Sequence, residues 1–328
     1  MSANGNDDLE TVIPDIDQIF IDYPNADVIL RSSDNVDFRF SKSLLSLASS
    51  VFETMFKLPR SLDMESKDLV VDDLPVVLVE EKSGILEKLL RFCYPVAAKD
   101  IPYLTTLEDV QSLLGAAVKY EMEGLEQHVK RALVAPEFGG KEPLRVFAIA
   151  CRFKLDDVIQ IAAKYTLDQP ILERPYIAEL EFITGGHLHQ VQTYYADCAE
   201  AAKGVGINLC WLKEHSFVWF RFQERSRRCS CVEKSIGVGN PAVTVWAMQW
   251  WRDYLQSTIK ALGHRPCGDE IRKPVLTEEA IMKAALCPIC RERAVPDLRL
   301  FNQLYAIEVD RVVSEVSVID SAFSHMLS

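Results

Sequence analysis

The apolar positions of residues 26–56 change from a strand-like to a helix-like spacing. In ADVILRSSDNVDFRF, apolar and polar residues alternate on both sides of a Ser/Asp/Asn segment, which predicts a β-hairpin. From Leu44 onward, apolar residues recur every three or four positions, as on one face of a helix. The pattern therefore predicts one helix that runs to about Phe56, with Ser41 at its N-cap.

This helix carries more apolar surface than packing within one domain requires, since a single stripe about 100° wide is enough. One stripe contains Leu45, Ala48, Phe52 and Met55. An adjoining stripe contains Leu44, Leu47 and Val51. Two interpretations of the second stripe stay open. Either a second copy of the chain covers it, which would bury both copies at once, or helices within 144–200 or the C-terminal tail cover it within one chain.

Further short elements follow this helix. LVVDDLPVV contains a short strand, and GILEKLLRFCYP predicts a short amphipathic helix that ends at Pro95. Residues 105–133 predict two helices with a break near Met122, the first capped by Thr105 or Thr106. The pattern of 116–125 recurs at 149–158, so we expect a second helical hairpin there, with an aromatic residue before its bend.

The pattern divides the chain into four segments. We expect a disordered acidic leader at 1–20, a compact α+β domain at 21–134, a helical extension at 144–203 and an all-α C-terminal region at 204–328. The segment PEFGGKEP is the best linker candidate because it is rich in Pro and Gly.

Composition narrows the function classes. The chain has 328 residues, 48% of them hydrophobic, and a net charge of −12, which disfavours a phosphate backbone as a direct ligand. No apolar run is long enough to span a membrane, and the first residues are too polar for a secretory signal. Nine cysteines without a signal favour reduced thiols. We therefore expect protein partners, neither membrane nor nucleic acid, and a cytoplasmic or nuclear location.

The segment 27–134 resembles a BTB/POZ domain. The resemblance lies in the ordered set DVIL, FRF, LLSLASSVFETMF, LVVDDL and LLRFCYP, followed by the helical pair of residues 106–133. The order of FRFSKSLLSLASSVFETMF before a helix that ends in CYP is also similar to fungal members of this family. The resemblance implies a cluster of helices flanked by a short sheet, and a protein-interaction function. It also implies that residues 144–203 are similar to a BACK extension.

The resemblance further implies which residues interact. Many family members form homodimers through the opening helix and the elements before it, and some bind a cullin scaffold as ubiquitin-ligase adaptors. Asp27 and Lys42 match the charged pair near the family's dimer interface; the alternative is a plain surface ion pair. The candidate interaction residues are Asp27, Lys42, Leu44, Leu47 and Val51. Two residues depart from the resemblance: Ser41 stands where the family usually has His, and Ser50 stands where fungal members often have Pro.

Four cysteines in the C-terminal half form two closely spaced pairs. They are Cys229 and Cys231, spaced C-x-C, and Cys287 and Cys290, spaced C-x-x-C. Four thiolates form a complete ligand set for tetrahedral zinc, so one structural zinc ion is the cofactor that the sequence indicates. The spare candidate ligands are His215, Cys210 and Cys267. The alternative is that these cysteines are reduced thiols without a metal.

No spacing of Ser, His and Asp, and no pair of carboxylates, indicates a catalytic site, so we predict that the chain is not an enzyme. Four arginines lie close together in the sequence: Arg221, Arg225, Arg227 and Arg228. We interpret this arginine cluster as one face of a helix that is exposed to solvent. The sequence thus predicts a non-enzymatic interaction module that self-associates. One alternative is a cullin-binding adaptor that uses the surface near 105–133 and the helices after it. The other is a transcription-linked regulator, although the sequence has no zinc-finger array or basic region to support it.

Overall fold

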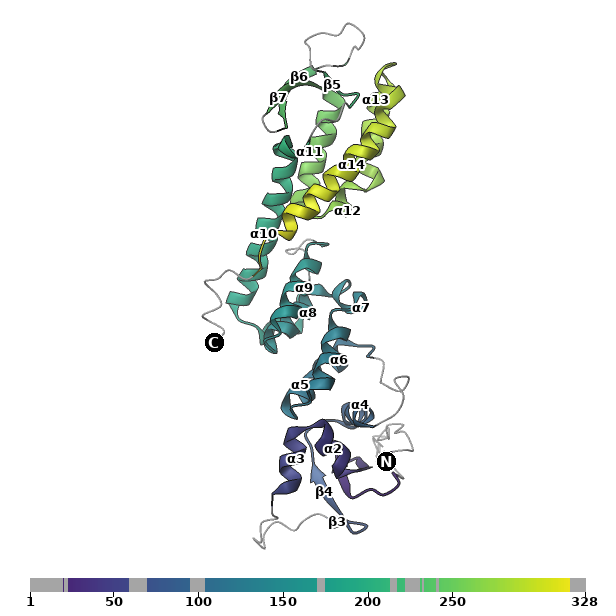
Figure 1. Cartoon of the computed structure of the whole chain (residues 1–328), viewed down its shortest axis with the longest axis vertical. Helices are drawn as coiled ribbons and strands as arrows, with labels where there is room; N and C mark the ends of the chain where they lie inside the picture. The colour runs from purple at the N-terminus through teal and green to yellow at the C-terminus, as the bar shows by residue number, and fades with distance from the viewer. Residues whose placement is uncertain are drawn as a thin grey trace, which may run out of the picture. The chain divides into compact units, whose positions relative to one another are not determined.

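The computed structural model describes residue 20 and several ranges of the chain. These ranges are 23–58, 70–94, 104–169, 175–212, 217–221, 231, 233–239 and 242–318. The chain divides into two compact units, Met1–Phe138 and Gly139–Ser328, and most of their helices and strands are labelled in Figure 1. The leader expected at 1–20 lies outside the described residues, except for the buried Phe20.

A four-stranded sheet with the order β2-β1-β4-β3 forms part of the first unit. Its strands are β1 (Val28–Arg31), β2 (Asp37–Phe40), β3 (Val70–Val71) and β4 (Leu74–Leu78). The predicted hairpin is confirmed, since β1 and β2 pair antiparallel, while β1 and β4 pair parallel. A second, tight hairpin joins β3 to β4. Its two turn residues, Asp72 and Asp73, have φ values of 51° and 63°, as a turn that follows the twist of the strands requires.

Six helices are described in full between Lys42 and Gly139, the first residue of the second unit. They are α2 (Lys42–Ala48), α3 (Ser50–Lys57), α4 (Ser83–Cys93), α5 (Leu107–Lys119), α6 (Glu123–Leu133) and α7 (Pro136–Gly139). The single helix predicted from Ser41 to Phe56 is wrong, because the chain breaks at Ser49 into α2 and α3. Ser49 is extended at φ −145°, and its hydroxyl donates to the Tyr120 carbonyl at 2.5 Å and accepts from the Phe52 N–H at 3.1 Å. A buried serine hydroxyl that bonds to the backbone in this way offers an alternative to continuing the helix.

The turn between β1 and β2 also fixes the start of α4. The Asp34 carboxylate accepts hydrogen bonds from the Ser83 backbone N–H at 2.8 Å and from the Ser83 hydroxyl at 2.7 Å. Partial loss of water around the Asp34 carboxyl would on its own raise its pKa, but hydrogen bonds from Ser32 and Ser83 outweigh this effect and lower the pKa to about 2. Asp34 therefore acts in place of an N-cap side chain, because the N-cap residue Lys82 makes no side-chain cap bond.

We expect Asp34→Asn to lower the free energy of unfolding by about 0.5–1 kcal/mol at neutral pH, a modest loss because the side chain is exposed. A carboxyl whose pKa is depressed in the folded state stabilises the fold above its unfolded pKa and loses that contribution as pH falls toward about 2. The difference in the free energy of unfolding between the natural chain and Asp34→Asn should therefore become smaller in acid. Urea unfolding at about pH 7 and about pH 3 tests this, and a gap independent of pH would contradict it.

The second unit is predominantly helical, as predicted. Its helices are α8 (Pro143–Arg152), α9 (Asp156–Thr166), α10 (Gly185–Ile207), α11 (Gln249–His264), α12 (Gly268–Ile271), α13 (Pro274–Ala285) and α14 (Cys290–Ser314), with 3₁₀-helices η3 (Ala178–Phe182) and η4 (Leu209–Trp211). None of the helices in the described part of the chain is long and apolar enough to cross a membrane.

A small sheet in the second unit was not predicted. Its antiparallel strands are β5 (Phe220–Arg221), β6 (Glu233–Val238) and β7 (Val243–Met248), in the order β5-β7-β6. We expected residues 204–328 to be all-α, yet β7 ends at Met248 and α11 begins only at Gln249. The alternation of Val243, buried Val245 and buried Ala247 is the period-two signal that the helical interpretation overlooked.

The recurrence predicted between 116–125 and 149–158 is present as the same bend in two helical hairpins. The bend residues Glu121 and Lys154 have φ values of 49° and 54°. The Met122 N–H donates to the Ala117 carbonyl at 2.8 Å, and the Leu155 N–H donates to the Ala150 carbonyl at 3.0 Å. These are the bonds of a Schellman motif, so each hairpin ends its first helix with the same hydrogen bonds.

Three long helices, α10, α11 and α14, lie side by side in the second unit (Figure 1). Helix α10 continues through position 203, where we expected the helical extension to end. A Cβ atom at Gly206 would collide with the Tyr305 hydroxyl and lie 2.5 Å from Cγ1 of Ile259, so glycine allows this close approach. The helices enclose an aromatic core. Its members include Phe217, Trp219, Trp250, Trp251 and Phe301.

Candidate functional site

Helices α2 and α3 carry the apolar residues that the sequence analysis divided into two stripes. In the first stripe, Leu45 and Phe52 are fully buried, whereas Met55 is 37% exposed. In the second stripe, Leu47 is 86% exposed, and Leu44 and Val51 are half-buried. We call Leu44, Leu47 and Val51 the α2–α3 surface. One stripe therefore packs into the core, and the α2–α3 surface stays partly open to solvent.

Asp27 and Lys42 lie at the start of α2 and contact each other through the backbone. The Asp27 carboxylate accepts a hydrogen bond from the Lys42 backbone N–H at 2.7 Å. Asp27 thereby does what we predicted for the Ser41 side chain, which makes no cap hydrogen bond. The Lys42 ammonium lies 5.9 Å from the centroid of the Phe56 ring. Asp27 thus orients the first turn of the helix that carries Leu44 and Leu47.

Three further apolar side chains of the first unit are exposed, which the sequence pattern did not predict. Leu78 on β4 is 67% exposed, Val70 on β3 is 52% exposed, and Leu58 after α3 is 65% exposed. In the sequence, each of the three lies next to other apolar residues, as it would in a buried strand or helix, so its exposure could not be predicted. Only the folded sheet shows which side of β3 and β4 stays open.

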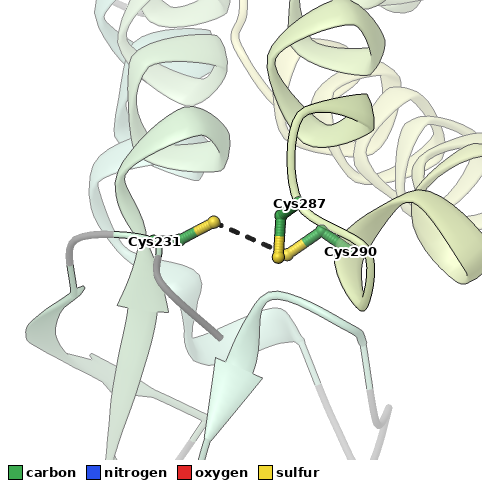
Figure 2. A group of neighbouring side chains, drawn as sticks. All are labelled: Cys231, Cys287 and Cys290. Carbon is green, nitrogen blue, oxygen red and sulfur yellow. Dashed lines mark hydrogen bonds between the residues drawn. The ribbon is translucent and has the colours of Figure 1, made fainter. Parts of the chain in front are cut away.

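Three cysteines of the second unit converge, as Figure 2 shows. The sulfur atoms of Cys231, Cys287 and Cys290 all lie within 4.8 Å of one another, and 3.8 Å separates those of Cys231 and Cys290. Cys231 lies just before β6, Cys287 lies between α13 and α14, and Cys290 is the first residue of α14. Cys287 and Cys290 are buried, and Cys231 is half-buried. We call these three residues the cysteine cluster; it could hold a metal ion.

The structure brings together three of the four predicted cysteines. Cys229 and the spare candidate His215 lie outside the described residues, so their part in the site stays a prediction. Cys210 and Cys267 are free thiols that do not belong to the cluster. Of the arginine cluster, only Arg221 is placed, in β5; Arg225, Arg227 and Arg228 also lie outside the described residues.

A cavity of about 330 Å³ lies against the cysteine cluster. Cys231 and Cys287 line it together with the apolar side chains of Trp250 and Leu286. Leu286 is 86% exposed at the rim. The cavity therefore gives small solutes access to two of the three sulfur-bearing residues.

Comparison with known proteins identifies the first unit. Residues 20–137 match the family model of the BTB/POZ domain, a range that includes the four-stranded sheet and helices α2 to α6. The chain therefore contains a BTB/POZ domain, followed by a helical C-terminal region. BTB domains mediate protein–protein interactions, so the first unit is a protein-interaction module.

Among solved structures, the chain is similar to the BTB domain of zebrafish PATZ1. The two are 19% identical, the match covers 33% of this chain and 75% of that chain, and the TM-score is 0.25. A search of curated proteins found no match. The closer likeness to fungal members of the family stays a prediction.

Proposed function

We propose that this chain is a non-enzymatic interaction module whose BTB domain self-associates through the α2–α3 surface. The exposure of Leu47 carries the proposal, because 86% of a large apolar side chain is open to solvent between half-buried Leu44 and Val51. Clustered exposed apolar side chains are typical of interaction surfaces. The resemblance stated above supports the same region, since many family members pair through the opening helix.

Symmetry makes this surface effective in a homodimer. In a two-fold pairing the same patch meets itself, so each buried residue counts twice. Burial of one exposed leucine contributes about 1.5–3 kcal/mol, and two copies of Leu47 would therefore contribute about 3–6 kcal/mol. The Asp27 carboxylate, which bonds to the first turn of α2, holds the helix that presents this side chain.

Leu47→Glu is expected to weaken self-association about a hundredfold or more, because each dimer loses two apolar contacts and gains two charges at the interface. Light scattering after size-exclusion chromatography, over a range of loading concentrations, measures the change. Val118→Glu is a matched control, since Val118 is a 45% exposed apolar residue on α5, outside the α2–α3 surface.

The two variants separate this proposal from a general effect of charge. The control should dimerise like the natural chain, and both variants should keep its helical circular dichroism. A natural chain that stays monomeric at high micromolar concentration contradicts the proposal. Equal weakening by Leu47→Glu and Val118→Glu also contradicts it.

A cullin-binding adaptor is the second candidate function. The observation that favours it is the helical hairpin of α5 and α6 in the BTB domain, which recurs with the same bend in α8 and α9. Capture of a purified cullin N-terminal domain by the immobilised full chain tests this role. Retention that persists in Leu47→Glu supports an adaptor surface separate from the dimer surface, and no retention counts against the role.

We also propose a reducing compartment, the cytosol or the nucleus, as the place of this function. None of the eight cysteines in the described part of the chain forms a disulfide, as such a compartment favours.

A further inference from the structure

We propose that the cysteine cluster is a structural zinc site in which Cys231, Cys287 and Cys290 supply three of the four ligands. The inference concerns the second unit and goes beyond the interaction function proposed for the BTB domain. Thiolates are the ligands that Zn²⁺ prefers at closed structural sites, and the cluster contains nothing but cysteines.

The distances fit a tetrahedral ion. With zinc–sulfur bonds of about 2.3 Å, the edge of a sulfur tetrahedron is about 3.8 Å. The sulfur atoms of Cys231 and Cys290 are 3.8 Å apart, and all three lie within 4.8 Å of one another. A disulfide is a different arrangement, because its sulfur atoms are about 2.05 Å apart. One ion placed among the three sulfur atoms therefore needs little movement of the side chains.

The local backbone already presents two of the sulfurs together. After α13, the Cys287 N–H donates to the Ala284 carbonyl at 3.1 Å, and the Arg291 N–H donates to the Cys287 carbonyl at 3.1 Å. The resulting turn directs both C-x-x-C side chains to one side, as Figure 2 shows. Cys290 is also the first residue of the 25-residue helix α14, whose N-terminal dipole favours negative charge on a nearby sulfur.

The third sulfur comes from a distant part of the sequence. Cys231 precedes strand β6, so an ion at the cluster would attach the small sheet to the turn between α13 and α14. A single buried cysteine is adequately explained as a small apolar side chain. That explanation gives no reason why three cysteines from two segments, two of them buried, should meet at zinc-binding distances.

The cavity lined by Cys231 and Cys287 is a route by which the ion reaches the sulfur atoms. Because the ion would join two segments far apart in the sequence, its binding energy would contribute to the stability of the second unit. The site is therefore assigned a structural role.

The test is the metal content of the full-length chain, purified without chelators and measured by inductively coupled plasma mass spectrometry. We expect about one zinc ion per chain, and a loss of most of it in Cys287→Ser and in Cys290→Ser. Cys267→Ser is the matched control and should keep its zinc, since Cys267 is a half-buried cysteine outside the cluster.

A second measurement covers the case in which a cluster variant does not fold. Zinc in the natural chain is exchanged for Co²⁺, whose visible bands and near-ultraviolet thiolate charge-transfer band report tetrahedral sulfur ligation. Observation of these bands supports the site. A natural chain that holds no zinc after incubation with Zn²⁺ and reduction overturns the proposal, as does equal zinc loss in Cys267→Ser and Cys290→Ser.

The dimer proposal and the zinc proposal fail separately. Leu47→Glu should leave the zinc content unchanged, because Leu47 belongs to the other compact unit. A monomeric chain that contains zinc contradicts only self-association, and a dimeric chain without zinc contradicts only the metal site.

Discussion

Phe52→Ala is expected to lower the free energy of unfolding of the BTB domain by about 3–5 kcal/mol. Phe52 is fully buried on α3, and its ring stacks on Tyr120 with centroids 4.7 Å apart and on Phe56 with centroids 6.0 Å apart. Its backbone N–H bonds to the Ser49 hydroxyl, so the same residue links the break between α2 and α3 to the core. Since a domain is typically stable by only about 5–15 kcal/mol, the loss removes a large part of the stability.

Urea unfolding of the full chain, with hydrogen exchange to locate the opened segments, measures this loss. Exchange should rise within the first unit and stay unchanged in α10, α11 and α14, which belong to the second. Phe56→Ala is the control. Because Phe56 is only half-buried, we expect a smaller loss of about 1–2 kcal/mol. Similar losses in the two variants would contradict the assignment of Phe52 to the core.

The second large effect is expected in the second unit, where Trp219→Ala should cost about 3–5 kcal/mol. Trp219 is fully buried between two parallel rings. Its centroid lies 4.7 Å from that of Phe217 and 5.7 Å from that of Trp251, and Phe301 meets its edge at 5.7 Å. Removal of the indole would leave a cavity that these rigid rings cannot fill without shifting.

Trp219→Phe separates ring packing from hydrogen bonding. The indole N–H has no hydrogen-bond partner in the described part of the structure, so its loss should cost nothing beyond the smaller ring. We therefore expect a loss of under about 1.5 kcal/mol for phenylalanine. Near-ultraviolet circular dichroism and urea unfolding measure both variants. If phenylalanine were as damaging as alanine, the stacked aromatic core would not be the source of the stability.

Local sequence rules account for much of the first unit. The alternation before Phe40 predicts the hairpin, and Thr106 caps α5 by accepting a bond from the Asp109 N–H at 3.2 Å. The hairpin and the cap depend on residues close together in the chain, so both can be predicted from the sequence. The bend at Glu121 and the equivalent bend at Lys154 can be predicted from the sequence for the same reason.

The break between α2 and α3 at Ser49 could not be predicted from neighbouring residues in the sequence. The apolar spacing continues across Ser49 without interruption, so the pattern predicts one helix. The break depends on the Tyr120 carbonyl, 71 positions away, which accepts the Ser49 hydroxyl hydrogen bond. The same holds for Asp27 and Ser41, because the choice of capping side chain depends on how close β1 lies to α2.

The sequence by itself determined the BTB fold, the two apolar stripes of its opening helices and the spacing of Cys287 and Cys290. The fold was expected from the resemblance of an ordered set of segments to the BTB/POZ family, whereas the stripes and the cysteine spacing follow from periodicity and from chemistry within a few residues. Only the tertiary structure decided that Leu47 stays exposed while Leu45 is buried, and that Cys231 lies beside the other two cysteines. Burial and convergence depend on contacts between distant segments, and no local pattern specifies which distant surface will cover a given side chain.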